Sequence, residues 1–197
     1  MRRRLVVLFG AGAVGMGMCD RTHLAFGVLR QAGPAFLGQG LWVMPLFGAS
    51  GVAMVLGHGA VRRWFGEPLR PARPGAAVAS ALLGGAAYFV TGPLQKAPLA
   101  LASGLFAAWL VRALLRRSPA SIAVSLVLCV AGPLVEATVS RLGLHTYARP
   151  DLLGVPIWLP GIYLHGGLLA ADIEPFIFPG LAGPKRPAPA AMDRARP

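Results

Sequence analysis

The chain has 197 residues, of which 55% are hydrophobic and only 13% are charged, and its formal net charge is +12. Soluble domains carry about 25% charged residues, so this composition excludes an ordinary soluble domain and indicates a membrane protein. The basic residues form short clusters between apolar runs, without one continuous basic face. This pattern favours anionic lipid headgroups over nucleic acid as their counter-charge.

Six apolar segments are long enough to be transmembrane helices, each of which needs about 20 residues. The runs are continuous, without the alternation typical of membrane β-strands. The sequence therefore predicts an all-α integral membrane protein, with one six-helix transmembrane domain over residues 1–178 and no soluble domain between the spans. In chain order, we expect the spans over Leu5–Leu24, Phe36–Val61, Gly75–Thr91, Leu99–Leu115, Ser121–Leu142 and Leu152–Phe178.

The basic residues also predict the orientation of the chain. If the N-terminus is cytoplasmic, 14 of the 19 basic residues fall on the cytoplasmic side. Such an excess predicts cytoplasmic termini and an even number of spans. Residues 179–197 are rich in Pro, Ala and Arg, and we expect a flexible cytoplasmic tail there. The five basic residues left on the outer side are Arg21, Arg30, Lys96, Arg141 and Arg149.

Gly10–Gly15 reads GxGxxG, as in dinucleotide-binding turns. No acidic residue follows about 20 positions later, and no strands alternate with amphipathic helices, so the dinucleotide interpretation is disfavoured. We interpret Gly12, Gly15 and Gly17 as a small-residue face that permits close helix packing or, equally, self-association into a homo-oligomer. Cys19 and Cys129 have no CxxC spacing and indicate neither a disulfide framework nor a zinc site.

Ionisable residues inside apolar spans are functional candidates, because a charge in the bilayer is costly. Glu136 lies deep in the fifth span, His165 lies inside the sixth, and Asp172 and Glu174 lie near its cytoplasmic end. The sequence contains no clustered metal-binding histidines and no nucleophile elbow. We therefore expect no catalytic residue, metal or cofactor. We expect Glu136 to pair with a polar neighbour or to face a hydrated cavity, and Asp172 and Glu174 to be interfacial.

Two other functions stay open. The first is a membrane enzyme that acts on a lipid or isoprenoid through Glu136, Asp172 or His165. The second is a small transporter or flippase. The transporter interpretation predicts internal repeats, and the first three predicted spans show no convincing match to the last three.

Prolines inside the spans predict bent helices, because proline removes a backbone hydrogen bond. Bent helices can leave an apolar cavity between them that a lipid tail or sterol would fill. Kinks without a cavity explain the same pattern. The prolines concerned are Pro45, Pro93, Pro133, Pro156 and Pro160.

Four segments, in order along nearly the whole chain, resemble the Insig (insulin-induced gene) family. Gly40–Pro45 resembles the family's Trp-Val-Pro start of the second span, and Phe65–Pro68 resembles its Leu-Gly-Glu-Pro loop. Leu99–Ala102 falls where the family has a Leu-Ser-Leu-Thr run. The longest match is Tyr147–Ile173, which contains Arg149-Pro150-Asp151-Leu152-Leu153, Trp158-Leu159-Pro160 and Gly166-Gly167.

The resemblance implies six helices around a central lipid-accessible cavity, in a protein that is not an enzyme. Animal members bind oxysterol and hold the Scap escort protein in the endoplasmic reticulum. The family's Asp-Arg-Ser-Arg-Ser loop appears here as Leu115–Pro119, without its acid, so the protein partner stays unknown. The Ala-, Gly- and Arg-rich composition suggests a bacterial homologue in an inner membrane. There we expect a diacylglycerol-like lipid in preference to a sterol.

The same resemblance suggests which residues line the lipid cavity. Gln95 is the polar residue closest to the family's sterol-contacting Gln, and Leu82 aligns roughly with an aromatic residue of the sterol site. Lipid in the cavity would stabilise one helix arrangement, which a partner could sense. The full set of expected lipid-binding residues is Trp42, Met44, Leu82, Gln95, Phe106, Trp158 and Tyr163.

Overall fold

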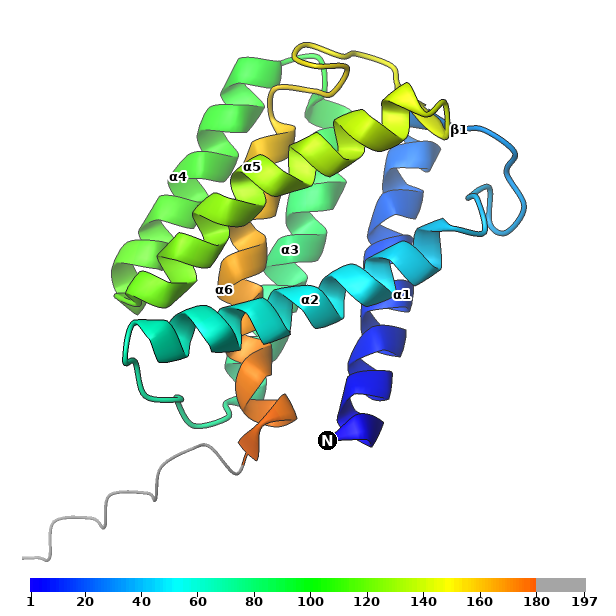
Figure 1. The fold of residues 1–197 in the computed structure, drawn as a ribbon. Helices are drawn as coiled ribbons and strands as arrows, with labels where there is room; N and C mark the ends of the chain where they lie inside the picture. Colours follow the sequence, from blue (N-terminus) through cyan, green and yellow to red (C-terminus); the bar gives the residue numbers. More distant parts are fainter. Residues whose placement is uncertain (180–197) are drawn as a thin grey trace, which may run out of the picture.

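The computed structural model describes residues 1–179, which form six helices and one small two-stranded sheet (Figure 1). The predicted all-helical class is confirmed. The expected flexible tail, apart from Pro179, lies outside the described residues. The elements are α1 (Arg2–Ala25), β1 (Leu29–Gln31), α2 (Val43–Trp64), α3 (Pro74–Leu94), α4 (Pro98–Arg116), α5 (Pro119–Arg141), β2 (His145–Tyr147) and α6 (Leu159–Ile177).

Helices α1 to α5 are each long and apolar enough to cross a membrane, so the chain is an integral membrane protein. Helix α6 is different, because it packs against α2, α3, α4 and α5 and is mostly buried among them. Its polar residues His165, Asp172 and Glu174 each form hydrogen bonds with side chains of other helices, as such groups do within a helix bundle. The bundle is built around α6.

The second and sixth helices begin later than predicted. Phe36 and Gln39 form an isolated bridge before α2, as do Leu152 and Val155 before α6. Each bridge closes a reverse turn, which requires left-handed backbone at residues 37 and 153. A helix cannot pass through such a turn. The predicted starts at Phe36 and Leu152 are therefore wrong, although these turns are as apolar as the helices that follow.

The structure contains an internal repeat of a helix–strand–helix unit. Strand β2 begins 116 residues after β1, and α6 begins 116 residues after α2. The same interval separates Leu37 from Leu153, both of which have φ 54°. The units α1–β1–α2 and α5–β2–α6 are thus two copies, with α3 and α4 between them. The comparison of the first three predicted spans with the last three could not detect this repeat, because each copy contains only two helices.

The two copies meet through their strands, at the end of the bundle opposite the N-terminus (Figure 1). Leu29 pairs with Tyr147 and Gln31 pairs with His145 in an antiparallel register. The paired residues occupy equivalent positions in the two copies of the repeat, so a local two-fold axis relates the two strands. The sheet therefore joins the first and last thirds of the chain.

A carboxylate lies at the same position of each copy, on α1 and on α5. Asp20 accepts a hydrogen bond from Gln31 Nε2 at 3.0 Å, and Glu136 accepts one from the Tyr147 hydroxyl at 3.3 Å. Glu136 also accepts a bond from the Tyr163 hydroxyl at 2.8 Å. The predicted polar partner of Glu136 is confirmed. A buried carboxylate needs such bonds to offset the loss of water.

At the N-terminal end of the bundle, a buried polar network joins α2, α5 and α6. Glu174, which is fully buried, accepts hydrogen bonds from His58 Nδ1 at 2.7 Å and Arg62 Nε at 2.9 Å. On its other side, His58 Nε2 lies 3.2 Å from Ser121 Oγ. Glu174 thus forms an ion pair inside the bundle, near the end of α6, and its predicted position at the membrane interface stays a prediction.

The network ends at Glu67, in the loop that follows α2. Its carboxylate accepts bonds from the Ser118 hydroxyl at 2.7 Å and the Ala120 amide at 2.6 Å, so it caps the N-terminus of α5. We expect Glu67→Gln to lower the free energy of unfolding by about 1–2 kcal/mol, because it removes an anion from a helix N-terminus. Thermal unfolding in detergent would measure the loss. A Glu67→Gln protein as stable as wild type would contradict the capping role.

Close helix contacts explain part of the predicted glycine face on α1. A Cβ on Gly12 would lie 3.1 Å from the Phe47 carbonyl oxygen, and a Cβ on Gly17 would lie 3.4 Å from Met44 Cγ. These two positions therefore permit α1 and α2 to approach each other, as predicted. Gly15 has open space around it within one chain, so it takes no part in this contact, and its role in self-association stays a prediction.

Candidate functional site

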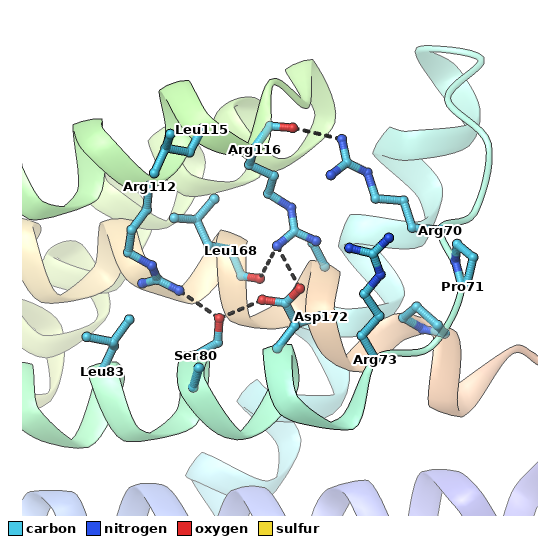
Figure 2. Close-up of a pocket in the computed structure, with 14 residues that line it drawn as sticks. Arg70, Pro71, Arg73, Ser80, Leu83, Arg112, Leu115, Arg116, Leu168 and Asp172 are labelled. Atoms are coloured by element: carbon cyan, nitrogen blue, oxygen red, sulfur yellow. Dashed lines mark hydrogen bonds and ion pairs between the residues drawn. The ribbon is translucent and has the colours of Figure 1, made fainter.

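A cavity of about 580 Å³ lies between α3, α4 and α6 (Figure 2). The loop between α2 and α3, which forms part of its wall, is at the same end of the bundle as the N-terminus (Figure 1). The wall of the cavity combines arginines with apolar side chains, so it could contact both parts of an amphiphile. The charged and polar residues in the wall are Arg70, Arg73, Ser80, Arg112, Arg116 and Asp172, and the larger apolar ones are Leu83, Leu115 and Leu168.

A second cavity, of about 400 Å³, continues along the same groove toward the opposite end of the bundle. Leu83 and Arg112 line both cavities, so the two adjoin. Apart from Arg112 and His165, the second cavity is lined by apolar residues of α3 and α4 and the loop between them, from Leu83 to Ala108. We call the two cavities together the α3–α4 groove. One end of this groove is basic and the rest is apolar.

Hydrogen bonds fix the polar side chains in the wall of the first cavity. Arg116 Nη1 donates to Asp172 Oδ1 at 2.7 Å, and Ser80 Oγ donates to the other oxygen of Asp172 at 2.5 Å. Arg112 Nη2 in turn donates to Ser80 Oγ at 2.7 Å. These bonds, drawn in Figure 2, connect α3, α4 and α6 across the groove.

His165 anchors the other side of Arg112. The Arg112 guanidinium donates to His165 Nδ1 at 2.8 Å, and His165 Nε2 donates to the Leu105 carbonyl oxygen at 3.2 Å. Because an arginine can only donate, His165 accepts at Nδ1 and carries its proton on Nε2. The imidazole therefore holds one face of the guanidinium in place at the junction of the two cavities.

The three residues considered for catalysis do not form one site. Glu136 lines a different, smaller cavity, while Asp172 and His165 line the α3–α4 groove and each contacts a different arginine. Among residues 1–179, no group of three or more His, Cys, Asp or Glu side chains could hold a metal ion.

None of the seven expected lipid-binding residues is among those that line the α3–α4 groove. Leu82 and Phe106 are exposed on the outer surfaces of α3 and α4. Gln95 Nε2 donates to the Phe26 carbonyl oxygen at 3.1 Å, and Met44 packs on Gly17. Their role in lipid contact remains a prediction.

The three remaining expected residues gather nearer the sheet. Trp158 is 1% exposed in the main hydrophobic cluster, and Tyr163 bonds to Glu136. Trp42 lines the smaller cavity, of about 20 Å³, together with Glu136 and His145. The structure therefore brings these three aromatic residues to one end of the bundle and does not place them with Leu82 and Phe106.

His145, in β2, gives this end a pH dependence. Burial lowers the pKa of its imidazole to about 4, although Glu136 Oε2 lies 3.4 Å from Nε2. The unfolded chain takes up this proton near pH 6.5, so stability is lost as the pH falls from there toward 4. We expect the melting temperature of wild type to fall more, or rise less, between pH 7 and 5 than that of His145→Gln. Parallel slopes in the two proteins would contradict this assignment.

The sequence analysis did not predict Ser80 as a site residue. It counted Arg112 and Arg116 only as basic residues on the cytoplasmic side and did not predict their hydrogen bonds. A signal was present, because Arg112 lies one turn inside an apolar span and ionisable residues there are costly. The pairing of Ser80 with Asp172, which are 92 residues apart, requires the folded structure.

Two solved structures resemble most of the chain. A crystal structure of a cross-linked trimer of a cysteine variant of MvINS matches with a TM-score of 0.82 at 21% identity, over 94% of this chain and 98% of that one. The mycobacterial Insig homologue MvINS from Mycobacterium vanbaalenii matches with a TM-score of 0.80 at 22% identity, over 88% and 93% of the two chains. No family model and no curated protein matches the sequence. At this identity, the likeness establishes the fold.

Proposed function

We propose that this chain, a membrane protein with the fold of a bacterial Insig homologue, is a non-enzymatic lipid-binding protein whose ligand lies in the α3–α4 groove. The shape and chemistry of the groove carry the proposal. Two adjoining cavities form one site that is basic at one end and apolar along the rest. Ligand sites usually combine a mostly apolar wall with a few fixed polar groups.

The apolar cavity suits an acyl chain. Leu83 and Leu94 mark its length along α3, and 11 helical residues span about 16 Å. Half of a bilayer's hydrocarbon core is about 15 Å, so the cavity is long enough for most of one acyl chain. Each methylene group that is transferred from water would contribute about 0.8 kcal/mol of binding free energy. An acyl chain that is transferred from the bilayer was not in water, so its binding free energy comes mainly from packing.

The groove also supports a role in lipid sensing. Helices α3 and α4 make few contacts with each other, and both pack on α6. A lipid between them would therefore favour one separation of α3 and α4, which a partner protein could bind selectively. In this proposal all six helices span the inner membrane, both termini are cytoplasmic, and the basic end of the groove faces the cytoplasm.

We further propose that the protein forms a homo-oligomer. The support is the cross-linked trimer of MvINS, which has the same fold. Cross-linking of the full chain in its membrane would test the assembly, and a monomer at every cross-linker concentration would contradict it.

Lipid binding can be tested by filling the groove. Ala108 lines the apolar cavity, whereas the neighbouring Ala107 is exposed on α4 and does not. We expect Ala108→Trp to lower the amount of co-purified lipid several-fold, because the indole would occupy the space of the acyl chain. Mass spectrometry of lipids retained by the purified protein would measure the change. Ala107→Trp is the matched control, and we expect wild-type lipid content in that variant.

Two results would contradict the proposal. One is the absence of stoichiometric lipid from the wild-type protein, with no change in stability after delipidation. The other is equal lipid content in the Ala108→Trp and wild-type proteins.

A further inference from the structure

The basic end of the α3–α4 groove carries more positive than negative charge. Four arginines line it, at positions 70, 73, 112 and 116, and Asp172 is the only acid in its wall. Its one carboxylate is already shared between Arg116 and Ser80. An anion in the cavity would therefore offset charge that the protein itself leaves uncompensated.

The arginines also have N–H groups that donate no hydrogen bond within the protein. A guanidinium has five N–H donors. Arg70 Nη2 uses one of these for the Arg116 carbonyl oxygen at 2.8 Å, at the end of α4. Arg116 Nε is buried without a hydrogen-bond partner, and both Arg70 and Arg73 are exposed at the mouth of the cavity (Figure 2). A ligand with several acceptor oxygens would satisfy these groups.

Phosphate meets this requirement better than a hydroxyl does. Its oxygens accept paired hydrogen bonds from guanidinium groups, and its charge matches theirs. The hydroxyl of a diacylglycerol or a sterol carries no charge, so it would leave the arginines uncompensated. The apolar side chains in the same wall, including Leu83 and Leu168, lead from the arginines into the acyl-chain cavity.

We propose that the basic end of the α3–α4 groove is a phosphate site that selects an anionic glycerophospholipid. The phosphate lies among Arg70, Arg73 and Arg116, and an acyl chain passes Leu83 into the apolar cavity. This inference rests on the proposed lipid-binding function and names the headgroup that the groove takes.

Competitive binding to the delipidated full chain in detergent tests the headgroup. The probes are dioleoylphosphatidylglycerol, dioleoylglycerol and inorganic phosphate, and native mass spectrometry counts the bound ligand. We expect the phospholipid to bind about a hundredfold more tightly than the neutral lipid, since each of the three nearby arginines contributes about a fivefold effect. We expect this preference to shrink as salt is added. Inorganic phosphate should compete only weakly, because it lacks the acyl chain.

Variants separate this site from general surface charge. Arg73 lies in the loop before α3 and has an exposed side chain, so Arg73→Gln should fold and should weaken phospholipid binding about fivefold. Arg70→Gln should have a similar effect. Arg63→Gln is the matched control, because Arg63 is exposed at the end of α2 and does not line the cavity. Its effect should stay below about twofold, as for a distant surface charge.

Three results would overturn the phosphate site. They are equal binding of phospholipid and diacylglycerol, equal losses in Arg63→Gln and Arg73→Gln, and competition by inorganic phosphate as strong as that by the phospholipid. The first two leave the lipid-binding function intact, and the third indicates free phosphate as the ligand. Failure of every lipid to bind would instead remove the proposed function itself.

Discussion

Replacement of Glu174 with Gln is expected to lower the free energy of unfolding by about 3–5 kcal/mol, the typical cost of breaking a buried ion pair. Glu174 is fully buried and accepts bonds from both His58 and Arg62. The amide keeps the size of the side chain but removes its charge, so the buried guanidinium of Arg62 loses its counter-ion. Denaturant unfolding in detergent would measure the loss.

A double variant supplies the control for Glu174. We expect Arg62→Met combined with Glu174→Leu to recover at least half of the lost stability, because removing both charges also removes the uncompensated one. A loss below about 1 kcal/mol in Glu174→Gln, in the range of exposed pairs, would contradict the assignment of a buried ion pair.

The second large effect is expected for Gly167→Ala, which should destabilise the protein by about 3 kcal/mol through overpacking. A Cβ at position 167 would lie 2.8 Å from the Ser121 carbonyl oxygen and 2.5 Å from the Ser125 amide nitrogen. Both atoms belong to the backbone of α5, so no side chain can rotate out of the way. Helices α5 and α6 must separate to accept the methyl group.

The internal repeat supplies the comparison for Gly167. Gly51 occupies the equivalent position of the first copy, where a Cβ would only touch Gly12 Cα at 3.5 Å. We expect Gly51→Ala to be tolerated, and Gly15→Ala, in open space, to gain up to about 1 kcal/mol from helix propensity. Melting temperatures of the three variants would give the order. A Gly167→Ala protein as stable as wild type would show that the α5–α6 contact is not tight.

The sequence predicted the helices well because long apolar runs are a strong signal in a membrane protein. The starts of α2 and α6 were missed because the turns at Phe36–Gln39 and Leu152–Val155 are as apolar as a span. Hydropathy does not distinguish the two conformations. What distinguishes them is the left-handed backbone at Leu37 and Leu153, which ordinarily favours glycine or asparagine. A leucine at these positions does not indicate a turn in the sequence.

The candidate site was harder to predict than the fold. The Insig-like motifs directed attention to aromatic residues such as Trp158, which is a core residue in the structure. The groove residues are mostly alanine, glycine and leucine, which occur throughout the chain. Arg112, Ser80 and Asp172 come from three helices, and only their packing shows that they lie together.

The separation of the two repeat copies has a consequence for biosynthesis. Strand β1 leaves the ribosome more than 100 residues before β2, and Arg62 precedes its partner Glu174 by 112 residues. Until α6 packs against α2, Arg62 lacks the carboxylate that neutralises it in the folded bundle. The packing of α6 is therefore the step that completes this buried ion pair. A chain that stops before it would leave Arg62 as a mark by which membrane quality control could recognise the unfinished product.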